Sequence, residues 1–250
     1  MRGIRARVRS LDFARDDVVS LSFMNVVFDF DNTLFEAERL KFALYGFVET
    51  YGFSQDDAKE MYRLSRDKDG HVTFSPERFC EVLNDAIEKK QQGISVDPSF
   101  VREHLMQHVG VVTGAIALLK QLKEQQVPMY LLSLGVPEWQ HEKVLMSGID
   151  IFFPAEHIQY TTHVHEGKIV AFREIFGADF SGKDTYLFND KPDETAVLLD
   201  TFVDLRAYLR RDPDDMRYAK EDFDALVATY PDRAIYAEDL TNGAAFLHLS

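Results

Sequence analysis

Two carboxylates follow a short apolar run near the start of the sequence. Asp29 and Asp31 come directly after Val26, Val27 and Phe28. A β-branched and aromatic run of this kind is typical of a strand buried on both faces. In an extended chain, residues i and i+2 point to the same side, about 6.6 Å apart, so the two acids share a side. Like charges that close resist joint ionisation, and a bound divalent cation is the usual compensation.

The strand is expected to end at Asn32 and Thr33, whose short polar side chains favour turns. Ligands of open α/β sheets bind at the carboxyl ends of the strands, so this turn is the expected site of chemistry. The alternative is a strand followed by a turn in which Asp29 and Asp31 are simply solvated. The apolar run before them favours burial instead.

Polar side chains also follow two later apolar runs. The strand expected over 127–132 ends at Ser133, and a hydroxyl there can bind an oxyanion. The strand expected over 186–188 ends at Asn189 and Asp190. Between them, Lys168 opens a helical pattern, where its charge opposes the helix dipole. That position suggests a lysine that holds a phosphate.

These four elements resemble, in type and order, the motifs of the haloacid dehalogenase (HAD) superfamily of phosphotransferases. The first is the hexapeptide Asp-Phe-Asp-Asn-Thr-Leu that begins at Asp29, and Ser133, Lys168 and Asp190 follow it. The likeness covers about residues 24–210. It implies an α/β fold with a three-layer Rossmann-like core and a parallel sheet, plus a small all-helical cap inserted after the first motif.

The resemblance also implies the role of each residue. Asp29 is the nucleophile that becomes an aspartyl-phosphate, and Asp31 is the general acid and then the base. The residues that bind the phosphoryl group are Ser133, Lys168, Asn32 and Thr33, of which Thr33 also fixes Asp31. The implied cofactor is Mg²⁺, and its ligands are Asp29, Asp31 (through its backbone carbonyl), Asp190, and Glu194 or Asp193. Two departures stand out, since Asn189 replaces the usual glycine and the family spacing falls on Glu194 where aspartate is common.

The chemistry agrees with this assignment. A carboxylate that attacks a phosphate dianion needs its charge neutralised, which a hard cation and a lysine can do. We therefore expect a magnesium-dependent phosphatase, of the phosphatase branch of the superfamily, that hydrolyses a small phosphomonoester. A dehalogenase would have no use for Asp31 as an acid. A phosphomutase uses the same acids and stays an alternative, as does a non-catalytic binding or regulatory protein with this core.

The periodicity changes twice along the chain. Residues 36–110 show helical spacing, with Leu40, Leu44 and Phe47 on one face, and are expected to form the cap. Residues 24–35 and 111–250 are expected to form the α/β core, because strand and helix patterns alternate again after 111. The first 23 residues form an arginine-containing extension to which we assign no function. Glu36, Lys41 and Tyr45 are candidate specificity residues because they lie close to the first motif.

Composition limits the partners. A net charge of −14 argues against nucleic acid and against anionic membrane surfaces. No apolar run approaches the roughly 20 residues of a membrane span. The single cysteine, Cys80, permits no internal disulfide, is expected to be buried, and is compatible with a reducing cytoplasm. We expect a cytoplasmic protein that acts on a small phosphorylated molecule, whose identity the sequence does not give.

Two other segments resemble metal-binding sites but lack ligands that such sites need. The segment 65–76 resembles a calcium loop but has Ser65 at the first position and Pro76 at the twelfth, where the loop needs acids. We expect a turn between helices there. His163 and His165 could ligate zinc, but no third ligand is evident, so a surface role is expected.

Overall fold

The computed structural model describes residues 24–68, 71–90, 93–162 and 167–249. The predicted extension 1–23 lies outside them, as do His163 and His165 and part of the calcium-like segment, Asp69 and Gly70. None of the helices in the described ranges has the length and apolar character that a membrane crossing requires.

Six parallel strands form the central sheet, in the order β5-β4-β1-β6-β7-β8. Their bounds are β1 Asn25–Asp29, β4 Met129–Leu134, β5 Ile158–Thr161, β6 Thr185–Asn189, β7 Arg206–Arg210 and β8 Ala234–Ala237. The first strand of the chain therefore lies in the middle of the sheet, between β4 and β6. Because all six strands are parallel, their carboxyl ends meet at one edge.

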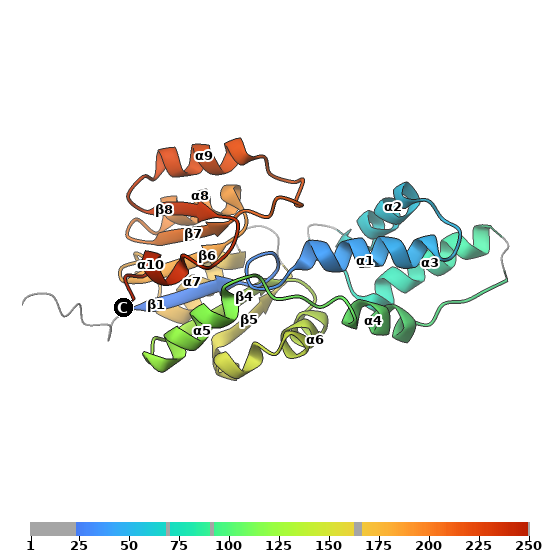
Figure 1. The fold of residues 1–250 in the computed structure, drawn as a ribbon, viewed down its shortest axis with the longest axis horizontal. Helices are drawn as coiled ribbons and strands as arrows, with labels where there is room; N and C mark the ends of the chain where they lie inside the picture. Colours follow the sequence, from blue (N-terminus) through green and yellow to red (C-terminus); the bar gives the residue numbers. More distant parts are fainter. Residues whose placement is uncertain (1–23, 69–70, 91–92, 163–166, 250) are drawn as a thin grey trace, which may run out of the picture.

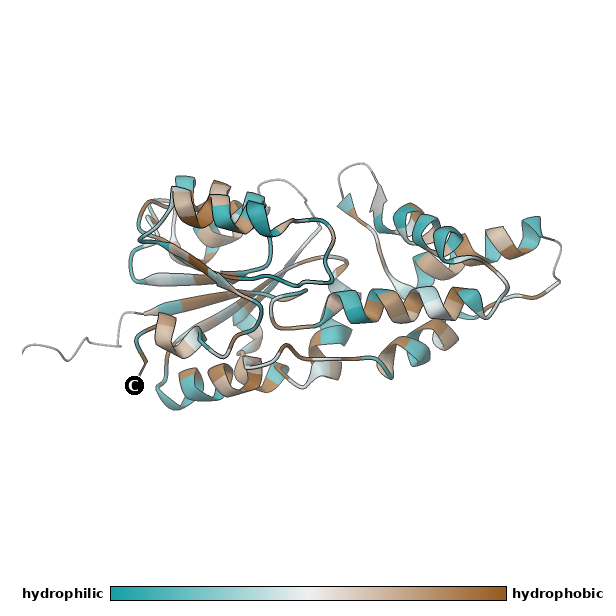
Figure 2. Cartoon of the chain, turned by 45° about the horizontal axis from the view of Figure 1, so that its top comes forward, coloured by the Kyte–Doolittle hydropathy of each residue, from teal (hydrophilic) through white to brown (hydrophobic). Residues whose placement is uncertain are grey.

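Helices cover both faces of the sheet, as expected for a parallel sheet. Val26 and Phe28 of β1 pack on one face with α5 (Ala115–Glu124) and α6 (Pro137–Ser147). Val27 packs on the other face, against a cluster from three helices: α7 (Gly167–Phe176), α8 (Pro192–Thr201) and α9 (Lys220–Thr229). The apolar strands lie between the helices, whose hydrophilic sides face outward (Figure 2). The predicted three-layer α/β core with a parallel sheet is confirmed.

A separate group of helices follows β1. It consists of α1 (Ala37–Glu49), α2 (Gln55–Arg66), α3 (Pro76–Lys89) and α4 (Pro98–Met106), which lie together beside the carboxyl edge of the sheet (Figure 1). The expectation of a purely helical segment is wrong at one point. A short antiparallel ribbon, β2 (Asp67–Lys68) and β3 (His71–Val72), joins α2 to the rest of the group where we expected a turn.

Two chain segments that run side by side connect this helical group to the sheet. Phe35 forms an antiparallel bridge with Val111. On either side of the bridge, the N–H of Glu36 donates to Gly110 O at 3.0 Å and the N–H of Val112 donates to Leu34 O at 2.9 Å. The remaining elements are the 3₁₀ turns Asp150–Phe152 and Ala155–His157 and the short helix α10, Gly243–Phe246.

Apolar spacing explains the inner faces of the helical group. In α3, Phe79, Leu83 and Ile87 are fully buried, and Ser75 caps the helix by accepting a hydrogen bond from the N–H of Arg78. Cys80 is 1% exposed, as expected, and its thiol donates to the carbonyl of Val96 at 2.9 Å.

Candidate active site

The carboxyl end of β1 carries the first pair of acids. Asp29 is the last residue of β1, and only 3% of its surface is exposed. Asp31 follows in the loop to α1, and 30% of its side chain is exposed. Asn32 adopts a left-handed conformation (φ 60°), which asparagine tolerates better than most residues, and its Oδ1 accepts a hydrogen bond from the N–H of Glu38. The turn thus joins the first motif to the start of α1.

Two buried hydroxyl groups belong to the same region. Ser133 lies in β4, one residue beyond the residue that pairs with Asp29, and Thr33 lies in the loop after β1. Within the described residues, neither Ser133 Oγ nor Thr33 Oγ1 has a hydrogen-bond partner. The resemblance implies that Thr33 fixes Asp31, but the hydroxyl of Thr33 makes no hydrogen bond to it. A buried polar atom without a partner costs about 1–3 kcal/mol, so an acceptor or donor from outside the chain would stabilise either hydroxyl.

Lys168 reaches this end of the sheet from the first turn of α7. Its Nζ lies 2.8 Å from Asp29 Oδ1 and 2.5 Å from Glu194 Oε2, and it donates to Asn189 Oδ1 at 2.9 Å. Burial alone would lower the pKa of Lys168, but the neighbouring carboxylates of Asp29 and Glu194 outweigh it and raise the pKa. Lys168 therefore carries a positive charge beside the predicted nucleophile.

Helix α6 holds the second acid of the motif. Lys143 Nζ donates to Asp31 Oδ1 at 2.5 Å, and Gln140 Nε2 donates to Asp31 Oδ2 at 2.9 Å. Lys143 and Gln140 are three residues apart on the helix, so they share a face, and both are almost fully buried. Lys143 Nζ also lies 5.4 Å from the ring centroids of both Phe30 and Phe35, within cation–π range. Asp31 is thus oriented by two donors that the motif does not contain.

Asp190 is the third acid, and it directly follows β6. Its Oδ2 accepts a hydrogen bond from Arg217 Nη2 at 2.9 Å, while its Oδ1 is buried without a partner among the described residues. Arg217 is held in turn by Asp215, which accepts hydrogen bonds from its Nε and Nη2. Burial and the nearby charge of Asp29 raise the pKa of Asp190 to about 7, although the positive charges beside it oppose the shift.

The two candidates for the supporting acid occupy different environments. Glu194 joins the buried network through Lys168. Burial would raise the pKa of Glu194, but the positive charge of Lys168 outweighs it and lowers the pKa to about 2. Asp193 is exposed and accepts hydrogen bonds from the hydroxyl of Tyr218 at 2.7 Å and from the N–H of Glu194. Of the two, Glu194 is therefore the acid that lies in the site.

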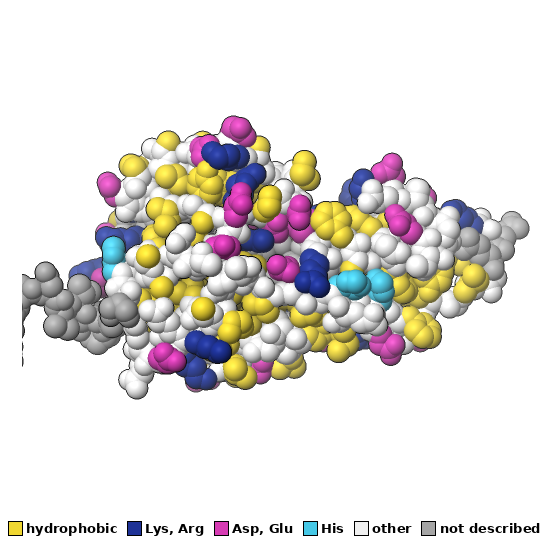
Figure 3. All heavy atoms as spheres, in the orientation of Figure 1, with side chains coloured by type: hydrophobic (Ala, Val, Ile, Leu, Met, Phe, Trp, Pro, Cys, Tyr) yellow, Lys and Arg dark blue, Asp and Glu magenta, His cyan; other side chains and the backbone are white. Residues whose placement is uncertain are grey.

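One cavity joins the three acids of the motifs. Asp29, Asp31 and Asp190 line it, and its volume is about 130 Å³. Basic residues line it as well: Lys41, Arg66, Lys143, Lys191 and Arg217. Of the three predicted specificity residues, Lys41 lines the cavity, and Glu36 and Tyr45 are not among its lining residues. Acidic and basic side chains also gather on the surface between the sheet and the helical group (Figure 3).

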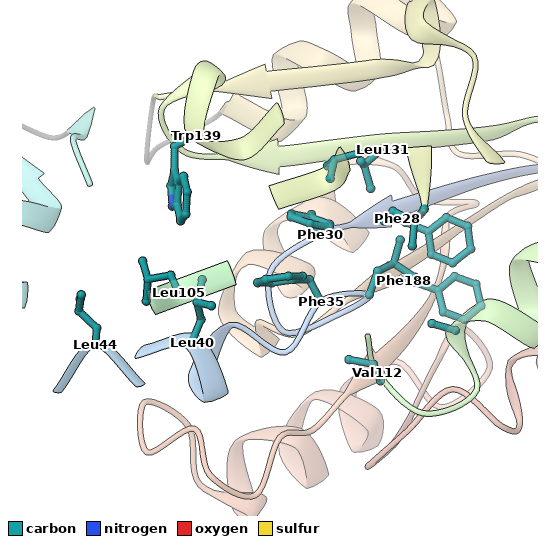
Figure 4. Close-up of a cluster of buried hydrophobic side chains, with 14 of the residues drawn as sticks. Phe28, Phe30, Phe35, Leu40, Leu44, Leu105, Val112, Leu131, Trp139 and Phe188 are labelled. Atoms are coloured by element: carbon teal, nitrogen blue, oxygen red, sulfur yellow. The ribbon is translucent and has the colours of Figure 1, made fainter. Parts of the chain in front are cut away.

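The wall opposite the acids is apolar. Trp139 of α6 points toward Leu105 of α4, and Leu40 and Leu44 of α1 continue the wall (Figure 4). Phe74 connects it to the rest of the helical group, with ring centroids 6.4 Å from Trp139. The cavity thus has a charged end at the sheet and an apolar end between the core and the helices.

The donor atoms fit a small divalent cation held by few protein ligands. Asp190 Oδ1 is a buried carboxylate oxygen without a partner, and carboxylate oxygens are the ligands that Mg²⁺ prefers. No group of three histidine, cysteine, aspartate or glutamate side chains in the described ranges is arranged to hold a metal ion. Lysines engage the carboxylates of Asp29, Asp31 and Glu194, so among the predicted acids Asp190 offers the carboxylate oxygen without a partner in the described residues. Mg²⁺ is commonly bound by one or two carboxylates, with water and substrate phosphate completing its shell.

Sequence reasoning missed four residues of the site. Gln140 and Lys143 had a detectable signal, since both follow Ser133 on one face of the next helix. Lys191 had a local signal as well, since it stands next to Asp190 in the chain. Arg217 had no local signal, because it lies in a loop after β7 far from every motif.

Comparisons with known proteins agree with this architecture at the level of the fold. The sequence matches no protein-family model, and it matches no curated protein. Solved structures do match. A magnesium-bound HAD-hydrolase from Bacillus subtilis has a TM-score of 0.57 and 16% identity, covering 91% of this chain and 99% of that chain.

Two further matches show the range of related proteins. A HAD family hydrolase from Deinococcus radiodurans with bound phosphate and sodium has a TM-score of 0.56 and 17% identity, over 90% of this chain and 96% of that chain. The L-2-haloacid dehalogenase from Xanthobacter autotrophicus has a TM-score of 0.57 and 14% identity, over 90% and 98% of the two chains. Matches at this low identity concern the fold. The chain has the fold of the haloacid dehalogenase-like hydrolases, as its four motifs predict.

Proposed function

We propose that this protein is a magnesium-dependent phosphatase that hydrolyses a small phosphomonoester through an aspartyl-phosphate. The observation that carries the proposal is the convergence of Asp29, Asp31 and Asp190 on one cavity, with Lys168 Nζ 2.8 Å from Asp29. These groups come from the ends of two strands, β1 and β6, and from the helix α7, which are distant in the sequence. Asp29 and Asp31 line the cavity and Lys168 contacts Asp29 from behind it, so a nucleophile, an acid and a positively charged partner lie together, as a catalytic constellation requires.

The first half of the reaction uses Asp29 and Asp31. A carboxylate oxygen of Asp29 attacks phosphorus, and the bond from phosphorus to the leaving oxygen breaks. Asp31 gives its proton to that oxygen, so the alcohol leaves neutral. Lys168 balances the negative charge on the transferred group, and Ser133 Oγ can donate a hydrogen bond to it.

The second half regenerates the enzyme. Asp31 now accepts a proton from water, and the resulting hydroxide attacks the phosphorus of the aspartyl-phosphate. The bond between Asp29 and phosphorus breaks, which releases inorganic phosphate. Asp29 and Asp190 would hold Mg²⁺, with the backbone carbonyl of Asp31, and the ion when bound supplies charge that stabilises the phosphoryl oxygens.

The arrangement of Asp31 favours phosphoryl transfer over dehalogenation. Displacing a halide requires no proton donor, whereas an alkoxide leaving group does. Two buried donors, Lys143 and Gln140, orient Asp31. Such support is expected where the carboxyl group must reach a leaving oxygen.

We further propose that α1–α4 form a cap that moves about the paired segments at Phe35 and Val111. These segments are the two connections that lead into and out of the helical group. A cavity of about 130 Å³ is smaller than the roughly 300–1,000 Å³ that suits a drug-sized ligand, so it fits a small substrate. Closure of the cap would exclude water until the alcohol has left.

A screen of phosphorylated metabolites with Mg²⁺ tests the proposal, with Asp29→Asn run beside the wild type. The wild type should hydrolyse at least one compound, and D29N should lose at least about 10³-fold in kcat, since no covalent intermediate can form. Trapping the phosphorylated protein by mass spectrometry would locate the phosphate on Asp29. Equal turnover by both proteins would eliminate the mechanism, and no turnover by the wild type would favour a binding role.

A further inference from the structure

Three basic side chains lie beside the acids at the end of β1 and β6, and the motifs include only one of the three, Lys168. Lys168, Lys191 and Arg217 face Asp29, Asp190 and Glu194. Arg217 is shared between Asp190 and Asp215, so these three positive charges face four carboxylates, and Lys143 separately pairs with Asp31. The side chains of the site thus carry nearly as many positive as negative charges.

One nitrogen of Arg217, Nη1, is available to bind a ligand. Its Nε and Nη2 are engaged by Asp215, and Nη2 also donates to Asp190. Its Nη1 makes no hydrogen bond to any residue in the described ranges, and Arg217 lines the cavity. Asp215 is 6% exposed and fixes the guanidinium, so Nη1 is held in place for an acceptor from outside the chain.

Lys191 also has a donor group that is available to a ligand. It lines the cavity beside Asp190, yet its ammonium group forms no hydrogen bond with any described residue. A lysine side chain carries a positive charge near neutral pH, and this one lies beside the carboxyl group of Asp190. A charged donor next to a cavity needs acceptors, and a ligand with several oxygens supplies them.

Two buried hydroxyl groups lie near the same end of the sheet, although neither residue lines the cavity. Ser133 Oγ and Thr33 Oγ1 are buried and have no partner in the part of the chain that the structure describes. Both can donate to an oxygen atom, as the two cations can. Lys191 and Arg217 reach the cavity from separate segments of the chain, and two charged donors match an oxyanion better than a neutral ligand.

We propose that Lys191 and Arg217 are phosphoryl-binding residues, and that they allow the site to bind phosphate without a divalent cation. This inference rests on the proposed function, because it assigns two further ligands to the same phosphoryl group. It makes one prediction that the proposed function does not make. Magnesium is needed for the reaction, but phosphate should bind to Lys191 and Arg217 even when magnesium is absent.

The test is the binding of inorganic phosphate to the full-length protein in the presence of a chelator, measured by isothermal titration calorimetry. The wild type should bind phosphate. Arg217→Gln and Lys191→Met should each weaken binding at least about tenfold, or about 1.4 kcal/mol. Arg217→Lys keeps the positive charge but loses the planar guanidinium with its paired N–H donors. The affinity of this variant for phosphate should therefore lie between those of the wild type and R217Q.

Matched controls come from the opposite edge of the sheet. Arg206 is the first residue of β7, and Lys183 precedes β6 and is exposed. R206Q and K183M should bind phosphate as the wild type does. Circular dichroism and the melting temperature of each variant verify that the fold is intact before affinities are compared.

The outcomes separate this inference from the proposed function. If phosphate binds only after Mg²⁺ is added, or if R217Q and K191M bind it like their controls, Lys191 and Arg217 are not phosphoryl ligands. Turnover by the wild type in the same preparation would then leave the phosphatase proposal standing. If the wild type binds phosphate in the presence of the chelator and both variants bind it more weakly, the assignment is supported even before a substrate is known.

Discussion

Lys168 Nζ lies 2.8 Å from Asp29 Oδ1, in a pair whose side chains are 4% and 3% exposed. A buried pair stays stable only when further hydrogen bonds offset the cost of removing both charges from water. Lys168 has these in Glu194 and Asn189. The pair therefore joins β1, α7 and the end of β6 into one network, and it makes the predicted nucleophile depend on a lysine from another element.

Replacing Lys168 should destabilise the protein. Lys168→Met leaves the carboxylates of Asp29 and Glu194 buried without their partner, and breaking a buried pair costs about 3–5 kcal/mol. Urea unfolding followed by circular dichroism measures the loss. Lys183→Met removes an exposed lysine and should change the free energy of unfolding by less than about 0.5 kcal/mol. Equal unfolding midpoints for the two variants would show that the pair does not stabilise the fold.

Lys143 and Asp31 should act as one unit in catalysis. If Lys143 works by orienting Asp31, Lys143→Met should lower kcat/KM by about 10²-fold, and adding it to Asp31→Asn should lower it little further. Lys143→Arg keeps a donor and should recover part of the loss. Steady-state kinetics on all four combinations measure the coupling. Independent, multiplicative losses would contradict an orienting role for Lys143.

Magnesium binding should depend on pH. The pKa of Asp190 is raised to about 7, so in the metal-free protein this carboxyl group is largely protonated at pH 6 and largely ionised at pH 8. A metal ligand must be deprotonated, so Mg²⁺ should bind more tightly as the pH rises through 7 and should release protons below it. Calorimetry in two buffers with different ionisation enthalpies counts the protons.

Asp190→Asn provides the control for that experiment. Its amide cannot titrate, so the proton release near pH 7 should disappear even if weak metal binding remains. The same variant should flatten the stability of the metal-free protein between about pH 4 and 7. There the wild type loses stability as pH rises, because a group whose folded pKa is raised stabilises the fold only while it is protonated. Proton release that persists in D190N would assign the titration to another group.

Tyr62 of α2 tests the contribution of the helical group. It lines the cavity, its ring packs against Phe74 with centroids 5.3 Å apart, and burial raises its pKa, so the hydroxyl stays a donor. Tyr62→Phe removes only that donor. KM should rise about tenfold with kcat changed less than about threefold, since a hydrogen bond to a charged group contributes about 1.5–3 kcal/mol.

A matched substitution shows whether the effect belongs to the cavity. Tyr186 lies near the start of β6, at the opposite edge of the sheet, and its hydroxyl lies 3.5 Å from Arg206. Tyr186→Phe should leave both kinetic constants unchanged. If Y62F also behaves like the wild type, the helical group does not contribute this donor to substrate binding.

Much of the fold could be predicted because its signals are local. The apolar runs that became β1, β4 and β6 each contain their own β-branched or aromatic residues and end in polar turns. Ser75 and Asp97 each precede a proline, and the helices α3 and α4 begin at those prolines. The ribbon of β2 and β3 was missed because strands of two residues are too short to show a period.

The sequence by itself determined which carboxylates would come together. Asp29, Asp31 and Asp190 follow strand patterns, and parallel strands bring their carboxyl ends to one edge whatever the intervening chain does. Only the tertiary structure decided how those charges are balanced. Lys143 and Arg217 reach Asp31 and Asp190 from a helix and a loop elsewhere in the chain. An ion pair depends on distance in space, and spacing along the chain carries no record of it.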